Sequence, residues 1–236
     1  MEISQEIVNQ VLGATQATVT VRNKVEVIGT IETEPTIHHQ THNENIYQFY
    51  LSVPRLRKDL CDEIRIEACE RGINPQNYKL GDKVKILGEF RSVNRREPDG
   101  SSHLILSVFV SKMSLLETNE KSNSIRLHGF LCKPPRFRTT PSGRDICDLM
   151  LAVNRNYKKC DYIPCVTWGR DASFAKDFKV GDSVFIEGRI QSREYKKRLN
   201  DNYDYELKKI SEVSVTSIKP MQEGEVVTET YVVEHN

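Results

Sequence analysis

The stretch Val25-Glu-Val-Ile-Gly29 has a counterpart one hundred residues later, Ile125-Arg-Leu-His-Gly129. Other landmarks keep the same offset: Pro35 with Pro135, Leu51-Ser-Val-Pro-Arg55 with Leu151-Ala-Val-Asn-Arg155, Leu80-Gly-Asp82 with Val180-Gly-Asp182, and Gly88 with Gly188. A fixed offset through several separated landmarks indicates an internal repeat. We therefore predict two copies of one domain of about 100 residues each.

Within each copy the pattern is mostly that of β-strands. Residues 84–90 and 184–190 alternate between apolar and polar side chains, as half-buried strands do, and residues 46–53 are rich in strand-forming types. Short helical segments are expected around 74–78 and 172–178. About five strands and one short helix per copy fit a small closed barrel, which leaves no exposed sheet edge. A seven-stranded sandwich would need more strands than each copy supplies.

The flanking segments complete the predicted organisation. We place the first copy at 21–117, a polar linker at 118–124 and the second copy at 125–219. Within an arm at 1–20, the apolar residues of 2–12 have helical spacing and predict an amphipathic helix. Residues 220–236 form an acidic tail, in which a run of valines could add a strand or pack on a neighbour.

Composition excludes several classes of protein. The chain has 236 residues, 38% of them hydrophobic and 28% charged, which is typical of a soluble globular protein. No apolar run is long enough to cross a membrane, and residues 1–20 lack the pattern of a signal peptide. We therefore expect a cytoplasmic protein, with its six cysteines reduced.

Motifs for catalysis or metal binding are missing from the sequence. There is no Walker loop, no Gly-x-Ser-x-Gly and no His-Glu-x-x-His, so we expect neither an enzyme nor a cofactor. The cysteines form no Cys-x-x-Cys pair, and the cluster His38-His39-x-x-His42 lies in a polar stretch. We interpret that cluster as a solvated loop and expect no metal site.

Charge is distributed unevenly between the two copies. Residues 20–118 contain 14 Lys and Arg and 14 Asp and Glu, whereas residues 125–219 contain 19 Lys and Arg and 12 Asp and Glu. Residues 220–236 contain four glutamates and no Lys or Arg. A basic second copy beside a neutral first copy indicates that the second copy contacts a polyanion.

Aromatic and basic residues are interleaved in the second copy. Binding of single-stranded nucleic acid needs cations along the phosphates and flat rings that stack on the bases. The candidate rings are Tyr157, Tyr162, Trp168 and Tyr195. The candidate cations are Arg136, Arg138, Arg155, Lys158, Lys159, Arg170, Arg193, Lys196 and Lys197. Alternatively, the rings are strand residues that pack inward beneath the Lys and Arg stems.

Five segments of the second copy follow the order of a known family. They are Pro135-Arg-Phe-Arg-Thr-Thr-Pro-Ser-Gly143, Leu149-Met-Leu-Ala-Val-Asn-Arg155, Asp161-Tyr-Ile-Pro-Cys-Val-Thr-Trp-Gly169, Lys179-Val-Gly-Asp182 and Ile186-Glu-Gly-Arg-Ile-Gln-Ser-Arg193. With them, residues 125–219 resemble the bacterial single-stranded DNA-binding protein family. The resemblance implies two tandem OB-folds, base-stacking rings at the four aromatic positions named above, and a nucleoid-associated protein. Because family assemblies typically present four OB-folds, it also implies a homodimer.

The first copy and the tail depart from this family pattern. Arg57 and Arg95 stand where the second copy has Tyr157 and Tyr195, and the segment Asp62–Cys69 contains no aromatic residue. The first copy is therefore predicted to be weakened for stacking: it either contacts phosphate or serves as a structural or oligomerising half. Its possible phosphate contacts are Arg55, Arg57, Lys58, Arg91, Arg95 and Arg96. The tail lacks the long linker and acidic tip with which family members recruit replication and repair proteins.

The predicted function is non-catalytic, largely sequence-independent binding of single-stranded DNA in replication, recombination or repair. Two alternatives remain at this point. The neutral first copy fits an OB-fold protein-interaction or oligomerisation module, of the kind found in primosomes, with weak nucleic-acid binding. An RNA ligand also fits, because RNA bases stack on such surfaces as well and only contacts to the 2′-hydroxyl separate the two.

Overall fold

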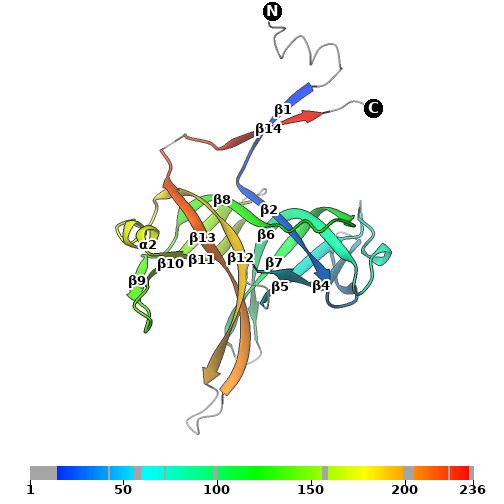
Figure 1. The fold of residues 1–236 in the computed structure, drawn as a ribbon, viewed down its shortest axis with the longest axis horizontal. Coiled ribbons are helices and arrows are strands. Elements are labelled where there is room, and N and C mark those ends of the chain that lie inside the picture. Colours follow the sequence, from blue (N-terminus) through cyan, green and yellow to red (C-terminus); the bar gives the residue numbers. More distant parts are fainter. Residues whose placement is uncertain are drawn as a thin grey trace, which may run out of the picture.

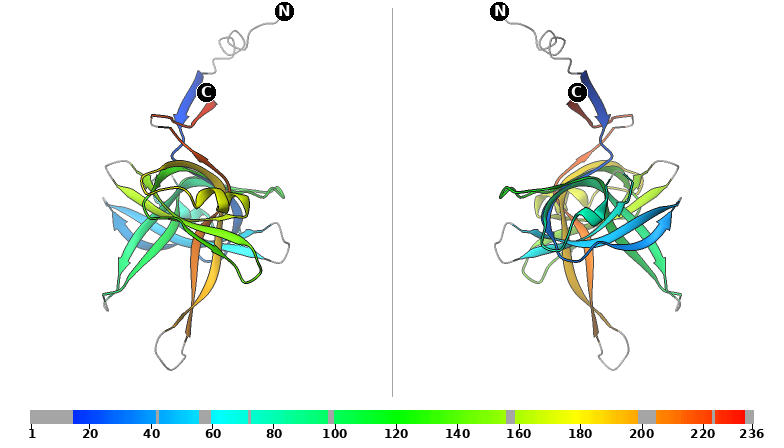
Figure 2. Two further views of the ribbon diagram at one scale, coloured as in Figure 1. Left: turned by 90° about the vertical axis from the view of Figure 1, so that its left-hand side faces the viewer. Right: turned by 90° about the vertical axis from the view of Figure 1, so that its right-hand side faces the viewer.

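Two β-barrels lie side by side, and a two-stranded ribbon projects from them (Figures 1 and 2). The computed structural model of the chain describes residues 15–41, 43–55, 60–71, 73–97, 100–155, 159–198, 205–222 and 224–233. Among these residues, no helix has the length and apolar character needed to cross a membrane.

The first barrel is built from five strands. They are β2 (Asn23–Ile31), β4 (Glu44–Pro54), β5 (Cys61–Cys69), β6 (Lys83–Arg96) and β7 (Ser102–Leu115). The strands pair in the order β2-β4-β5-β7-β6, and β6 returns to β2 and closes the barrel. Only the β5–β7 pair among these is parallel. The 3-10 helix η1 (Pro75–Asn77) lies between β5 and β6.

The second barrel repeats this plan. Its strands are β8 (Asn123–Leu131), β10 (Asp145–Asn154), β11 (Cys160–Trp168), β12 (Ser183–Arg198) and β13 (Tyr205–Pro220). They close in the corresponding order β8-β10-β11-β13-β12, and helix α2 (Arg170–Ala175) lies between β11 and β12. Small five-stranded barrels of this kind are OB-folds. The predicted tandem OB-fold is therefore confirmed, and the sandwich alternative is wrong.

The repeated stretch that opens each copy also joins the two barrels. β2 and β8 pair antiparallel, with Val25 opposite Ile125, and both side chains are fully buried. Through this pair the two barrels share one sheet and one apolar core. Pairing of β2 with β8 removes apolar surface of both barrels from contact with water, so the barrels form one packed unit.

Two glycines mark equivalent bends in the barrels. The pairing of β6 with β7 shifts at Leu87/Gly88, and that of β12 with β13 shifts at Glu187/Gly188. A Cβ on Gly88 would lie 2.2 Å from the Phe109 carbonyl oxygen, and one on Gly188 would lie 2.4 Å from that of Ser214. Only glycine allows the backbones this close, which explains the glycine at both bulges.

The ends of the described chain pair with each other. β1 (Thr15–Thr20) and β14 (Thr228–Val233) form the projecting ribbon (Figure 1). Glu229 contacts Lys24 and Arg126 at its base. The predicted helix at 2–12 lies outside the described residues, whereas the described part of the 1–20 arm is a strand. Part of the 220–236 tail is a strand as well.

Two shorter strands extend hairpins of the barrels. β3 (Thr36–Thr41) pairs with β4, and β9 (Arg136–Thr139) pairs with β10. His38 and His39 are exposed on β3, so the interpretation of this segment as a loop is wrong for these two residues. The pairing of β3 with β4 decides this, and the local polar composition does not reveal it. His42 lies outside the described residues.

Candidate nucleic-acid interface

The outward face of β11 carries two exposed rings. Tyr162 is 43% exposed and Trp168 is 40% exposed, while Ile163, Cys165 and Thr167 between them point into the barrel and are buried. Side chains alternate along a strand, so Tyr162 and Trp168, six residues apart, lie on one face. Their Cα atoms are separated by about 20 Å along the strand. The inward-packing alternative therefore does not apply to these two rings.

Cations border the Trp168 end of this face. In the register of the sheet, Trp168 lies opposite Ile146 of β10, which lies opposite Arg138 of β9. Arg136 lies two residues away along β9, opposite Asp148. Arg136 and Arg138 are exposed, and Arg138 forms an ion pair with Asp148 at 3.0 Å. Two predicted phosphate contacts therefore lie within reach of the strand that carries Trp168.

A third exposed ring lies in the row of Tyr162. Tyr162 is opposite Ala152 of β10, and Ala152 is opposite Phe130 of β8. Phe130 is 41% exposed, and side chains directly opposite one another share a face of the sheet. The sequence does not single out Phe130, because its neighbours are Gly129 and Leu131 and it belongs to none of the five segments that resemble the family.

The structure describes only some of the other predicted binding residues of the second barrel. Lys159 and Arg170 are exposed, and Arg193 is paired with Glu212 at 3.1 Å. The backbone of Tyr195, Lys196 and Lys197 lies on β12, in the long β12–β13 hairpin that extends away from the barrels (Figures 1 and 2). Tyr157 and Lys158 lie outside the described residues.

Two of the predicted phosphate contacts are engaged inside the protein. The Arg155 Nη2 donates to Asp161 Oδ1 at 2.7 Å, and the Arg55 Nη2 donates to Asp62 Oδ1 at 2.6 Å. The Arg55 Nη2 also donates to the Ser192 carbonyl at 2.6 Å. Both aspartates are buried, and these arginines compensate their charge.

The corresponding face of the first barrel differs in chemistry. In the registers of β4 with β5 and of β10 with β11, Glu63 of β5 stands at the position of Tyr162, Arg65 at that of Pro164 and Cys69 at that of Trp168. Arg65 is paired with Glu67 at 3.0 Å, and Glu63 with Lys209 at 2.9 Å. This face therefore presents paired charges where the second barrel presents rings.

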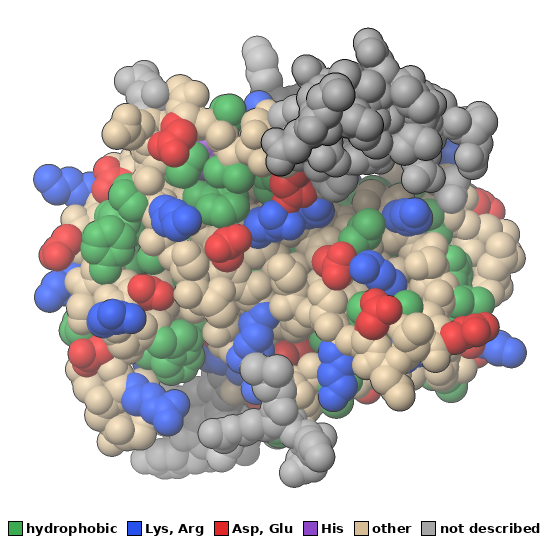
Figure 3. Space-filling view, turned by 45° about the horizontal axis from the view of Figure 1, so that its top comes forward, with side chains coloured by type: hydrophobic (Ala, Val, Ile, Leu, Met, Phe, Trp, Pro, Cys, Tyr) green, Lys and Arg blue, Asp and Glu red, His purple; other side chains and the backbone are tan. Residues whose placement is uncertain are grey.

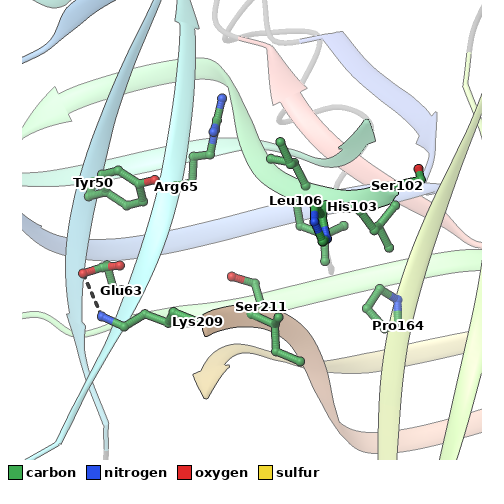
Figure 4. A pocket seen from close by; sticks show the side chains of 12 residues that line it. Tyr50, Glu63, Arg65, Ser102, His103, Leu106, Pro164, Lys209 and Ser211 are labelled. Carbon is green, nitrogen blue, oxygen red and sulfur yellow. Dashed lines mark hydrogen bonds and ion pairs between the residues drawn. The ribbon is translucent and has the colours of Figure 1, made fainter. Parts of the chain in front are cut away.

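A pocket of about 510 Å³ lies between the barrels, beside this face (Figure 4). Tyr50 and Arg65 line it from the first barrel, and Pro164 and Lys209 from the second. The Glu63–Lys209 ion pair crosses it (Figure 4), and the hydrogen bond that the Lys209 ammonium donates to Glu63 raises the pKa of Lys209. Charges in the pocket are thus largely satisfied within the protein.

The remaining cations of the first barrel are also partly engaged. Arg91 lies over the Phe109 ring at 3.7 Å and pairs with Glu89 at 3.0 Å, and Arg95 pairs with Glu97 at 3.5 Å. Arg96 is exposed at the end of β6, and Arg57 and Lys58 lie outside the described residues. Acidic and basic side chains are also interspersed on the face shown in Figure 3. Within the described residues, the exposed rings of β11 and the cations beside them therefore define the candidate interface.

Comparison with known proteins identifies the family. Residues 122–220 match the sequence model of the Single-strand binding protein family. Single-stranded DNA-binding protein 3 of Listeria innocua is 34% identical over 109 residues, which cover 43% of this chain and 67% of that protein. The chain belongs to the single-strand binding protein family. The matched region contains all strands from β8 to β13, including the rings and cations of the β9–β10–β11 face.

Other family members match a shorter part of the chain. Single-stranded DNA-binding protein A of Bacillus subtilis is 39% identical over 80 residues, which cover 31% of this chain and 46% of that protein. The chain spans about half the length of the first curated relatives that it matches.

A solved structure extends the likeness in fold to both barrels. The wild-type single-stranded DNA binding protein from Thermus aquaticus has 20% sequence identity and a TM-score of 0.69. The alignment covers 87% of this chain and 96% of that chain. The tandem arrangement of two OB-folds is therefore shared with a family member.

The cysteines of the chain form no disulfides. All six are free, and Cys147 and Cys165 are buried. Burial raises the pKa of the Cys147 thiol to about 11, so it is protonated at neutral pH. In the described residues, no group of three or more His, Cys, Asp or Glu is arranged to hold a metal ion.

Proposed function

We propose that the chain binds single-stranded DNA without catalysis and with little sequence preference, in bacterial replication, recombination or repair, at the nucleoid in the cytoplasm. One observation carries the proposal: Tyr162 and Trp168 are exposed on one face of β11, beside Arg136 and Arg138, in the barrel that matches the family. The names of the relatives, which describe single-stranded DNA-binding proteins, support it.

The chemistry of this face explains the lack of sequence preference. Every base has a flat π-face, so rings such as Tyr162 and Trp168 stack on any base, and stacking covers apolar ring surface that is otherwise exposed to water. The guanidinium groups of Arg136 and Arg138 bind phosphates, which are the same at every nucleotide. A duplex hides its bases within the stack and offers these rings no partner.

The two barrels have unequal roles in this proposal. The second barrel holds the main binding face, and the predicted rings Tyr157 and Tyr195 extend it. The first barrel is weakened for stacking because Glu63, Arg65 and Cys69 replace the apolar and aromatic side chains of β11. Carboxylates such as Glu63 also repel phosphate.

The fluorescence of Trp168, the single tryptophan of the chain, tests the function directly. We expect an unstructured thymidine oligonucleotide to quench it. With the two phosphate contacts of Arg136 and Arg138, the affinity should fall by about sevenfold when salt rises from 50 to 200 mM, because bound phosphates release counterions. Duplex DNA is the control and should quench little. Absence of binding to the oligonucleotide at low salt would favour a protein-interaction module.

We also propose that two chains associate into a homodimer that presents four OB-folds. The tandem barrels of one chain support this, because family assemblies are expected to present four such barrels. Light scattering on the purified protein should give twice the chain mass of 27.2 kDa. A concentration-independent mass of one chain would overturn the homodimer and leave the DNA-binding proposal intact.

A further inference from the structure

A serine of the first barrel holds the strand that carries the binding rings. Asp161 of β11 is fully buried, and its Oδ1 accepts the backbone N–H of Ser92 on β6 at 2.6 Å. The Ser92 hydroxyl in turn accepts the backbone N–H of Tyr162 at 2.7 Å. Tyr162 is thus tied to the first barrel at its own backbone, while its ring points outward.

The same contact occurs once more with the barrels exchanged. Asp62 Oδ1 accepts the backbone N–H of Ser192 at 2.7 Å, and the Ser192 hydroxyl accepts the backbone N–H of Glu63 at 3.0 Å. The two contacts are related by the internal repeat and differ in one functional respect. Ser92 holds the backbone of an exposed aromatic residue, whereas Ser192 holds that of a glutamate in an ion pair.

We propose that Ser92 is a positioning residue for DNA binding, and that the first barrel contributes to the interface through it. The proposal rests on the proposed function of the Tyr162 face. A stacking ring binds best when its strand is already held in the bound geometry, because less conformational freedom is then lost on binding. β10 pairs with β11 along one side of the strand. The hydrogen bond from the Tyr162 N–H to Ser92 restrains the strand on its other side.

Ser92→Ala tests the proposal, and Ser192→Ala is its matched control because it removes the equivalent bond. We expect Ser92→Ala to weaken binding of a labelled thymidine oligonucleotide by about three- to tenfold, the effect of losing about one hydrogen bond. Ser192→Ala should change the affinity by less than twofold. Both variants should lose similar thermal stability, and Ser92→Thr, which keeps the hydroxyl, should restore binding.

A double-mutant cycle separates positioning from general stability. In a Tyr162→Ala background, Ser92→Ala should have no further effect on affinity, because the ring that it positions is gone. Equal losses for Ser92→Ala and Ser192→Ala, or full additivity with Tyr162→Ala, would overturn the inference. Failure of the unaltered protein to bind single-stranded DNA would instead overturn the proposed function, so the two failures are distinguishable.

Discussion

Replacing Tyr162 and Trp168 together by alanine is expected to lower the affinity for single-stranded thymidine DNA by about 30-fold at least, and by up to about 10⁴-fold. Each stacked base contributes about 1–3 kcal/mol by alanine substitution, and about 1.4 kcal/mol corresponds to a factor of ten. Both rings are about 40% exposed, so their removal leaves the core intact. Anisotropy of a labelled oligonucleotide measures the change, and each single variant should fall between the wild type and the double variant.

Phe174→Ala is the matched control for this experiment. Phe174 is also an exposed ring, at 48%, but it lies on α2 and packs edge-on against Phe178. Its loss should change the DNA affinity by less than twofold. If the double variant bound as tightly as the wild type, base stacking on β11 would be excluded as the source of affinity.

Asp62→Ala is expected to destabilise the protein strongly, by about 3–5 kcal/mol, because it leaves buried partners uncompensated. Asp62 is 1% exposed, and its Oδ1 accepts from Arg55 and from the Ser192 backbone. Its Oδ2 accepts from Arg189 at 3.2 Å. For a chain of this length the loss corresponds to a fall in melting temperature of about 6–20 °C. Thermal unfolding followed by circular dichroism measures it.

Glu63→Ala, on the neighbouring residue, provides the comparison. Its ion pair with Lys209 lies at the surface, where such a pair contributes about 0–1 kcal/mol. Similar melting temperatures for the Asp62 and Glu63 variants would contradict the assignment of Asp62 as a central contact between the barrels. Asp161, the equivalent of Asp62 in the second barrel, has fewer partners. Its Oδ2 has no hydrogen-bond partner within the described residues, and burial raises the pKa of its carboxyl.

Local sequence patterns were sufficient for the architecture of each barrel. Strand alternation depends on neighbours two residues apart, and the constant offset between Val25 and Ile125, or between Gly88 and Gly188, reports two copies of one fold. The shared face of Tyr162 and Trp168 was predictable for the same reason, because a strand period of two places residues six apart on one side of the strand.

Contacts between strands and between the barrels decided features that local sequence patterns do not reveal. Arg55 and Arg155 were indistinguishable in sequence from phosphate-binding arginines. Each is nevertheless held by an aspartate of its own barrel that is buried and accepts the backbone N–H of a serine from the other barrel. The pairing of β1 with β14 made a strand of residues 15–20, which were predicted as part of an arm, and selected the strand among the two options predicted for the tail.

The sequence by itself thus determined two OB-folds and a basic, ring-bearing second half. The tertiary structure alone decided which cations remain exposed, that Phe130 lies in the row of Tyr162, and that Ser92 holds Tyr162. The physical reason is that a strand's period reveals which side of the sheet a residue faces. Its partner across the sheet or across the barrels is set by long-range pairing and by the need to satisfy buried polar groups.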